Sequence, residues 1–330
     1  MYSPIPCYRG VPVLFDASSS HSTGDTIATY AWQFGDGSTG RGRTIEHVFS
    51  SPGQYSVELT IVTEEAKQAF ASRKLTILHG LVVPSAYPSI QAAIDAATDG
   101  ETVVVMPGTY RENIRIRGKR ITVQSSDPDS SGVVRSTVIQ GAEEGRPTVR
   151  IGSGSEATLA GFTLLAGPLE GYEGAKCGAC FGIVYIREAS PTVRKNRIVN
   201  SPDTGIAIYE SGAKIEGNII SNNSADLPGG AIVVDSYRVA PRITRNTFEG
   251  NSATSGGAIF ITSTAVLDPE PACAAMTIVT GNVFRSNTAT RFSGGAIFVE
   301  YVGNLRLDSP DSNTYVGNEP DDVFYVVPPS

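Results

Sequence analysis

A short motif is written twice, almost unchanged, in the second half of the chain. NTFEGNSATSGGAIFI (246–261) is followed by NVFRSNTATRFSGGAIFV (282–299). Each copy has an Asn, an aromatic residue two places later, a second Asn three places further on, and then Gly-Gly-Ala-Ile. A motif that returns at unequal spacings is typical of a solenoid whose loops differ in length. The repeat therefore predicts that successive coils stack with like residues over like.

Weaker copies extend the repeat from Phe162 onward. Asn tolerates the backbone of bends and hydrogen-bonds neighbouring backbone groups, so stacked Asn side chains are predicted to form ladders. The apolar column fills the interior, and Gly allows a tight turn beside the next strand, so all these columns are predicted to be structural. They are the first Asn (Asn196, Asn218, Asn246, Asn282 and Asn313, with Phe162 in that place of an earlier coil), the apolar residue (Leu164, Ile198, Ile220, Phe248, Phe284 and Tyr315), the second Asn (Asn223, Asn251, Asn287 and Asn318) and the Gly (Gly182, Gly205, Gly230, Gly257 and Gly295).

The segment that precedes the repeat predicts how the solenoid begins. In YPSIQAAIDAATDGETVVVMPGTYRENIRIRGKRITVQ (87–124), Ser89 can cap a short helix that ends at Gly100, and three short strands follow. Such a helix, with its apolar stripe, would cover the open edge of the first coil. The segment resembles the entrance to right-handed parallel β-helices of the pectin-lyase-like superfamily. The stripe is Ile90, Ala93, Ile94 and Ala97.

The first part of the chain has a different pattern: short segments in which apolar and polar residues alternate, as in strands, are bounded by Gly, Ser and Pro. Trp32, the only Trp, is predicted to anchor a sandwich core, and Tyr55, Val57, Leu59 and Ile61 to line one buried face. FDASSS (15–20), YAWQFGDG (30–37) and HVFSSPGQYSVELTI (47–61) resemble the PKD domain, an immunoglobulin-like module. The fold class is therefore predicted to be all-β: a PKD-like β-sandwich over residues 1–79, and a right-handed parallel β-helix with a short capping helix over residues 80–330.

Bulk properties narrow the classes of function. The chain has a net charge of −7, whereas a nucleic-acid binder normally shows a basic face, so nucleic acid is not an expected partner. No apolar run of membrane-spanning length and no signal peptide is visible. The resemblance to PKD modules implies an extracellular or cell-surface setting. The pairing of the four cysteines is left open: Cys7, Cys177, Cys180 and Cys273.

A row of polar residues follows the Gly-column strands. Counting five residues on from each Gly aligns Arg187, Glu210, Asp235, Thr262 and Glu300. Adjacent strands lie about 4.8 Å apart, so Glu210 and Asp235 are predicted to be near neighbours, with Arg187 beside Glu210. Two long insertions, 167–180 and 263–275, are predicted to wall a groove along this row.

Three interpretations of this row stay open: a solvated rim, a sugar-binding strip, and a catalytic groove. In a sugar-binding strip, Tyr faces stack on sugar rings and carboxylates accept hydroxyl hydrogen bonds. In a catalytic groove, paired carboxylates act as acid and base in glycoside hydrolysis, or they hold Ca²⁺ while Arg or Tyr abstracts a proton, as in the lyases of the superfamily. The candidates are Tyr209, Tyr237, Glu300 and Tyr301 for ligand binding; Arg187, Glu210, Asp235 and Arg238 for catalysis; and Glu210 and Asp235 for calcium.

The chain lacks the compact motifs of the hydrolases that it resembles. GTYRE (108–112) matches the first block of pectin methylesterases, but the later acidic blocks are missing. Neither the Asn-Thr-Asp nor the Gly-His-Gly block of polygalacturonases is present. No His follows His79, so histidine acid–base catalysis is excluded in the β-helix.

These observations favour an adhesive, scaffolding or carbohydrate-binding role, with surface glycans or other surface proteins as partners. The combination of FEGN…GGAI and FRSN…GGAI resembles the repeats of bacterial surface adhesins over residues 228–299. A polysaccharide lyase or glycoside hydrolase is the alternative. A third possibility is a surface assembly formed by end-to-end docking, because DDVFYVVPPS (321–330) is apolar and shows no helical cap.

Overall fold

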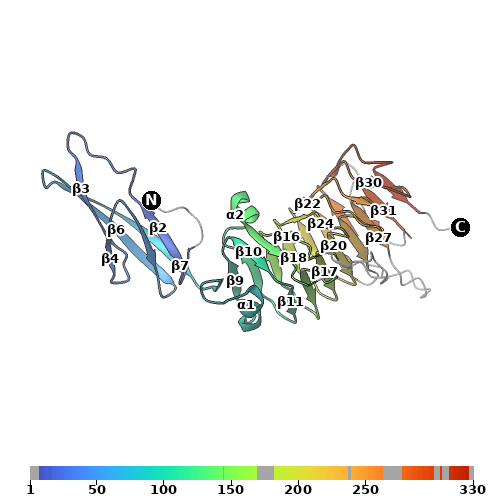
Figure 1. Ribbon diagram of the computed structural model, residues 1–330, viewed down its shortest axis with the longest axis horizontal. Helices are drawn as coiled ribbons and strands as arrows, with labels where there is room; N and C mark the ends of the chain where they lie inside the picture. The colour runs from blue at the N-terminus through green and yellow to red at the C-terminus, as the bar shows by residue number, and fades with distance from the viewer. Residues whose placement is uncertain are drawn as a thin grey trace. The chain divides into compact units, whose positions relative to one another are not determined.

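The computed structural model describes residues 7–143, 145–168, 182–236, 239–262, 277–300, 305–306 and 312–326 (Figure 1). The chain divides into two compact units, Met1–Pro88 and Ser89–Ser330. The last strand of the N-terminal five-stranded sheet ends at Leu78, and the first strand of the parallel sheets begins at Leu81. The boundary predicted at residues 79/80 stays a prediction, since the compact units divide after Pro88.

The first unit is a β-sandwich, as predicted. A five-stranded sheet in the order β1-β7-β6-β3-β4 is accompanied by the β2-β5 pair. All strand pairs are antiparallel except β1 with β7, which run parallel. The strands are β1 (Cys7–Tyr8), β2 (Pro12–Asp16), β3 (Ile27–Gln33), β4 (Thr39–Arg41), β5 (Thr44–Val48), β6 (Gly53–Thr63) and β7 (Gln68–Leu78).

Trp32 lies in the sandwich core, in contact with the Phe15 ring at a centroid distance of 5.5 Å. Its indole N–H donates to the carbonyl of Gly42 at 3.0 Å, so the polar end of the ring is satisfied. The face predicted on β6 is buried only at Val57, whereas Tyr55 and Leu59 pack half-buried against the core. The core consists of Val13, Phe15, Ala17, Trp32, Phe34, Phe49, Val57, Leu75 and Ile77.

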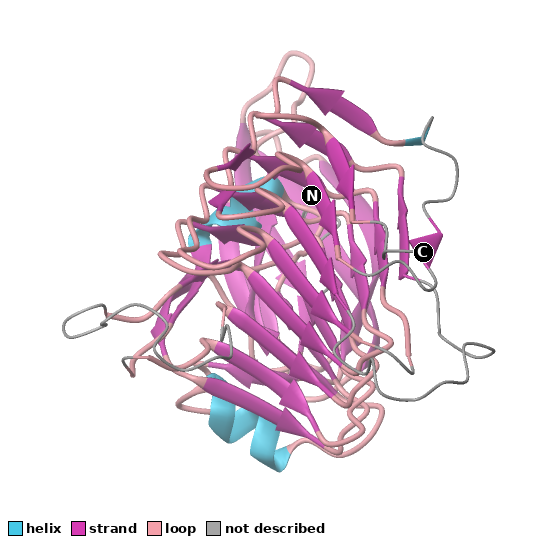
Figure 2. Cartoon of the chain, turned by 90° about the vertical axis from the view of Figure 1, so that its right-hand side faces the viewer, coloured by secondary structure: helices cyan, strands magenta, loops and turns pink. Residues whose placement is uncertain are grey.

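The second unit is a parallel β-helix with three sheets (Figures 1 and 2). Each coil contributes one strand to each sheet in turn, and every strand pair is parallel and in register. We refer to the nine-stranded sheet as sheet I; its end strand β8 precedes the division after Pro88, and its other eight strands belong to the second unit. Its strands are β8 (Leu81–Val83), β9 (Thr102–Val105), β12 (Thr122–Ser125), β15 (Thr158–Ala160), β18 (Thr192–Arg194), β21 (Lys214–Glu216), β24 (Arg242–Thr244), β28 (Thr277–Thr280) and β32 (Leu305–Arg306).

Sheets II and III have eight strands each, and two short strands, β26 (Ser252–Ala253) and β30 (Thr288–Ala289), pair beside them. Sheet II contains β10 (Gly108–Arg111), β13 (Thr137–Gln140), β16 (Thr163–Leu165), β19 (Arg197–Val199), β22 (Ile219–Ser221), β25 (Thr247–Glu249), β29 (Val283–Arg285) and β33 (Thr314–Val316). Sheet III contains β11 (Ile114–Arg117), β14 (Val149–Gly152), β17 (Val184–Arg187), β20 (Ile206–Tyr209), β23 (Ile232–Asp235), β27 (Ile259–Thr262), β31 (Ile297–Val299) and β34 (Val323–Tyr325).

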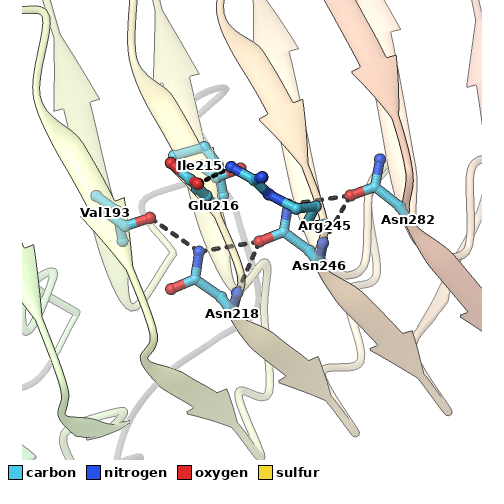
Figure 3. A network of polar contacts seen from close by, with 7 residues as sticks. All are labelled: Val193, Ile215, Glu216, Asn218, Arg245, Asn246 and Asn282. Atoms are coloured by element: carbon cyan, nitrogen blue, oxygen red, sulfur yellow. Dashed lines mark hydrogen bonds and ion pairs between the residues drawn. The ribbon is translucent and has the colours of Figure 1, made fainter. Parts of the chain in front are cut away.

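Both predicted Asn columns form buried ladders. Asn218 Nδ2 donates to Asn246 Oδ1 at 3.0 Å, and Asn246 Nδ2 donates to Asn282 Oδ1 at 3.1 Å (Figure 3). The same side chains also donate to backbone carbonyls of the preceding coil. Phe162, in the Asn place of an earlier coil, donates its backbone N–H to Asn196 Oδ1 at 3.0 Å. The second ladder follows the same rule through Asn223, Asn251, Asn287 and Asn318.

The apolar column lies in register along sheet II, as predicted. Its C-terminal members are aromatic and stack: Phe248 on Phe284 at 4.8 Å between centroids, and Phe284 on Tyr315 at 5.2 Å. Burial is the largest cause that raises the pKa of Tyr315 to about 12.

The predicted Gly column is wrong at one coil. Gly205 precedes Ile206 directly, whereas Gly230, Gly257 and Gly295 each stand two residues before their strand. The carbonyl of Thr204 accepts from Ile183, and that of Gly205 accepts from Val184, so Thr204 occupies the Gly place in this coil. In this coil the Gly stands one residue closer to its strand than it does in the neighbouring coils. A Cβ on Gly257 would lie 2.4 Å from the Gly295 carbonyl oxygen, which explains why Gly is needed where the coils approach most closely.

Helix α1 (Ile90–Ala96) covers the first coil, and its Ser89 cap is confirmed, since Ser89 Oγ accepts from Ala92 N–H at 3.1 Å. The helix ends at Ala96 rather than at Gly100, because the capping residue Ala97 is already extended. The Glu112 carboxylate accepts from Ile90 N–H at 2.9 Å and Gln91 N–H at 3.0 Å. The GTYRE motif therefore has a structural role. A second short helix, α2 (Ser131–Ser136), lies between sheets I and II.

Candidate functional site

Sheet III carries the predicted polar row on its outer face. Ile186, Ile208 and Val234 point into the coil and are fully buried, so the residues on either side of each point outward. Each central strand of sheet III thus presents two outward residues, which align with those of its neighbours. The outward rows are Arg115, Arg150, Tyr185, Ala207, Val233, Phe260, Phe298 and Phe324; and Arg117, Gly152, Arg187, Tyr209, Asp235 and Thr262.

The predicted place of Glu210 is wrong by one residue. Arg187 pairs with Tyr209, and Tyr209 pairs with Asp235. Glu210 lies beyond its strand with a positive φ of 41°, in the same turn position as Glu188. Its backbone N–H donates to the Asp235 carbonyl at 3.0 Å, so the two residues are neighbours through backbone but their side chains start from different rows. The reason is that Gly205 stands one residue closer to its strand than Gly230 and Gly257 do, so a count of five residues from it ends one residue too far along the chain.

Tyr185 is the centre of a compact patch on this face. The Arg150 guanidinium lies over its ring, 5.2 Å from Cζ to the centroid. The Tyr209 ring lies 5.4 Å from the same ring. The pKa of Arg187 is raised above its ordinary value. The larger cause is its contact with the Tyr185 hydroxyl, and the smaller is the Glu188 carboxylate. Tyr185 is only 6% exposed, so it positions the two guanidinium groups rather than offering its own ring to a ligand.

The arginines of β11 extend this patch. Arg115 pairs with Arg150, and Arg117 pairs with Gly152, which in turn pairs with Arg187. All four arginines are exposed. Gly152 has no side chain, so it leaves a gap between Arg117 and Arg187 in the second row. We call Arg115, Arg117, Arg150, Tyr185, Arg187 and Tyr209 the arginine–tyrosine face.

Sequence reasoning missed four members of this face: Arg115, Arg117, Arg150 and Tyr185. A signal for two of them was present, because IRIR (114–117) alternates apolar residues with arginines, as a strand with one outer basic face does. The contact of Arg150 with Tyr185 had no such signal. It depends on two strands separated by a long connection.

Towards the C-terminus, the same outer face becomes apolar. Val233, Phe260 and Phe298 form a separate hydrophobic cluster, joined by the half-buried Leu227 and Val326. The Phe260 and Phe298 rings stack at 5.6 Å, and Phe298 stacks on Phe324 at 5.3 Å. The two halves of the face therefore differ in chemistry, one cationic and one apolar.

Several predicted site residues lie outside the described residues: Tyr237, Arg238 and Tyr301. The two loops predicted to wall a groove also lie there almost entirely, as do Cys177, Cys180 and Cys273, so the groove and the pairing of the cysteines stay predictions. Cys7 is half-buried, and burial raises the pKa of its thiol. Glu300 is half-buried at the end of β31, and its N–H donates to the Ile261 carbonyl at 2.9 Å.

Within the described part of the chain, no group of three or more His, Cys, Asp or Glu residues is arranged to hold a metal ion. Glu210 and Asp235 alone offer two carboxylates, fewer than the ligands that Ca²⁺ takes. Calcium binding there stays a prediction that needs ligands from elsewhere.

Two family models match the chain. The model of the right-handed β-helix region matches residues 112–270 and, overlapping, 182–319, which is more than half of the chain. The chain belongs to the right-handed β-helix family. A PKD domain model matches residues 5–77. The predicted PKD-like sandwich, the predicted right-handed β-helix and the all-β fold class are therefore confirmed.

One curated relative is collagenase ColA of Bacillus cereus, which is 31% identical over 73 residues. The match covers 21% of the β-helix chain and 8% of the collagenase, so the chain spans a small part of that protein's length.

Three solved structures are similar to parts or all of the chain. A structure described by the promiscuous specificity of carbohydrate-binding modules of the β-sandwich superfamily is 25% identical, with 30% of this chain and 34% of that chain covered and a TM-score of 0.24. The PKD1 domain of Vibrio anguillarum Epp is 23% identical, with 23% and 90% covered and a TM-score of 0.20. The family 28 exopolygalacturonase of Yersinia enterocolitica is 10% identical, with 98% and 84% covered and a TM-score of 0.24. These TM-scores are too low to support a conclusion about the fold or the function of this chain.

No helix among the described residues has both the length and the apolar character needed to cross a membrane.

Proposed function

We propose that this β-helix protein binds carbohydrate at a cell surface or outside the cell, and that the arginine–tyrosine face takes a glycan that bears acidic groups. The observation that carries the proposal is that four exposed arginines lie on three neighbouring strands, two of them against the Tyr185 side chain, on a chain whose net charge is −7. Guanidinium groups bind carboxylates with two parallel hydrogen bonds. The extracellular setting rests on the resemblance to PKD modules.

The geometry of the face suits an extended ligand. Arg115, Arg150 and Tyr185 occupy consecutive strands in register, and consecutive strands are about 4.8 Å apart. A polymer lying along the coil axis would meet one guanidinium after another. The half-exposed Tyr209 ring, beside Arg187 in the second row, is the aromatic surface available to a sugar. An adhesive or scaffolding role would use the same contacts.

The electrostatics of Arg187 count against the alternative of a lyase that uses this residue as its base. A general base works best when its pKa lies near the working pH. The Tyr185 hydroxyl and the Glu188 carboxylate raise the pKa of Arg187, which makes its neutral form rarer. Arg187 is therefore assigned to binding.

The test is a binding titration of the whole chain with polygalacturonate and with a neutral glucan. Arg150→Gln and Arg187→Gln should each weaken polygalacturonate binding about tenfold, and a rise in salt should weaken it further because exposed charges are screened. Arg120→Gln is the matched control, since Arg120 is exposed, paired with Glu156 and outside the face. Equal binding of the neutral glucan, or equal loss in the control, would overturn the proposal.

The same samples should be examined for unsaturated products and for new reducing ends. Stable polymer supports a binding protein. Cleavage that disappears in Asp235→Ala would replace the binding function with catalysis on the same sheet.

A further inference from the structure

The outer face of sheet I, which follows sheet III along each coil, carries a second group of basic residues on strands nearer the C-terminus than most of the arginine–tyrosine face. Lys214 and Arg242 are in register on the neighbouring strands β21 and β24, and both are exposed. Neither forms an ion pair with a described residue. Like charges directly opposite each other on adjacent strands destabilise a sheet, so a bound anion would relieve a cost that the protein alone carries.

Arg245 adds a third cation next to this pair, at an unusual backbone position. The residue before the first-ladder place has a positive φ in five coils: three have Gly there (Gly161, Gly217 and Gly281), and the other two have Lys195 and Arg245. Arg245 has a φ of 57° in that place. A large side chain in the left-handed region costs free energy that Gly would avoid, and such outliers gather at functional sites.

The shape and the charge of this face fit an anion. Lys214, Arg242 and Arg245 line a shallow open hollow together with Glu216, Thr244 and Thr280. Glu216 forms an ion pair with Arg245 beside the Asn ladder (Figure 3). One carboxylate against three cations leaves the hollow positive. The Thr244 hydroxyl can donate a further hydrogen bond, whereas the Thr280 hydroxyl already shares one with the Ser312 hydroxyl at 2.7 Å.

We propose that this hollow is a separate binding site for tetrahedral oxyanions, the sulfate or phosphate groups carried by a polymer. A tetrahedral group offers three oxygens to three converging cations, whereas a carboxylate offers two. The hollow is open rather than enclosed, so a group that projects from a long chain can enter it. The described lining contains no aromatic residue on which bases could stack, which disfavours a single-stranded nucleic acid.

The ion pair of Glu216 with Arg245 sets the strength of the site. An entering oxyanion must share Arg245 with Glu216 and is repelled by its carboxylate. Removal of that charge should therefore strengthen binding, which is a result that loss of structure would not produce. Conversely, Arg245→Gly should keep the fold, because neighbouring coils already have Gly in that place, and should lose binding.

The experiment measures binding of dextran sulfate and of unsulfated dextran to the whole chain with Arg150→Gln and Arg187→Gln already present, so that the proposed glycan face contributes little. Lys214→Gln, Arg242→Gln and Arg245→Gly should each weaken dextran sulfate binding at least tenfold, and Glu216→Gln should tighten it about threefold or more. Arg120→Gln and Glu156→Gln, from an exposed ion pair elsewhere, are the charge-matched controls.

Inorganic phosphate and sulfate form the second arm. If these free anions displace dextran sulfate only at millimolar concentration, the result supports an oxyanion site whose ligand is a polymer. If free phosphate binds more tightly than the polymer, the ligand of the same site is a small anion. Three results would overturn the proposal: equal binding of unsulfated dextran, equal effects in the control variants, or a single-stranded DNA oligonucleotide that binds more tightly than dextran sulfate.

Discussion

The buried asparagines show how one side chain can complete a turn in a dry interior. Asn246 Oδ1 accepts from the backbone N–H of Asn218 at 2.9 Å, and Nδ2 donates to the Ile215 carbonyl at 2.9 Å. The Asn218 N–H would otherwise be buried without a partner, at a cost of about 1–3 kcal/mol. The amide is suited to this because it offers donors and an acceptor on one flat group.

Asn246→Ala should lower the free energy of unfolding by roughly 3 kcal/mol, because it leaves the buried Asn218 N–H unsatisfied and breaks the side-chain bonds to Asn218 and Asn282. The measurement is chemical denaturation of the whole chain, followed by circular dichroism. The neighbouring Glu249→Ala, on an exposed side chain, should change stability by less than about 0.5 kcal/mol. Similar losses in both variants would contradict the structural role of the ladder.

At the scale of one element, helix α1 is held by charged side chains at both ends. Glu112 binds its first N–H groups, and Lys119 Nζ donates to the carbonyls of Ile94, Asp95 and Ala97 at 2.6, 2.9 and 2.8 Å. An anion at the N-terminus and a cation at the C-terminus both complement the helix dipole. A helix of seven residues is too short to be stable alone, so these two contacts fix it on the coil.

Glu112→Gln should weaken the attachment of α1 by about 1 kcal/mol, because the amide keeps one acceptor but loses the charge at the helix N-terminus. Hydrogen exchange of the Ile90 and Gln91 amides should speed up about fivefold. Glu143→Gln is the control, since Glu143 is exposed and pairs with Arg146 outside the helix. Unchanged exchange in Glu112→Gln would show that packing alone holds the helix.

At the scale of the whole molecule, the chain combines two units that can be followed separately. Trp32 is the only Trp among 330 residues, and it lies in the core of the sandwich. Its fluorescence therefore reports the sandwich, while circular dichroism is dominated by the β-helix. Near Trp32, the GDG turn places Asp36 against His47, with Asp36 Oδ2 2.7 Å from His47 Nε2.

The sandwich should lose stability in acid as Asp36 becomes protonated. Burial alone would raise the pKa of Asp36, but hydrogen bonds from Ser38 and His47 outweigh it and lower the pKa to about 2 from an ordinary 3.8. The carboxylate thus stabilises the fold above pH 3.8, and this contribution, at most about 2 kcal/mol, is lost as the pH falls from 3.8 towards 2. Trp32 fluorescence should show a smaller pH dependence of unfolding in Asp36→Asn; an equal dependence would contradict this assignment.

The Asn and apolar columns were predictable because the ladder and the interior need those side chains themselves. The positions of the polar row on sheet III were harder to predict. Its register is set by strand hydrogen bonds and not by Gly, so counting from Gly205 displaced Glu210 by one residue. Counting inward positions from Ile186, Ile208 and Val234 would have placed Tyr209 beside Asp235. The contact of Arg150 with Tyr185 depends on which coils become neighbours, and that follows from the fold rather than from local pattern.

The asparagine ladder also gives the coil a polarity. Each rung accepts from the turn before it and presents its own N–H to the turn after it, so a turn is anchored by its successor. Long connections can then leave the corners without disturbing the alignment of the walls. A coil that keeps its two asparagines keeps its hydrogen bonds to the coils on either side. The outward-facing residues of such a coil can therefore be substituted while the buried interior stays the same.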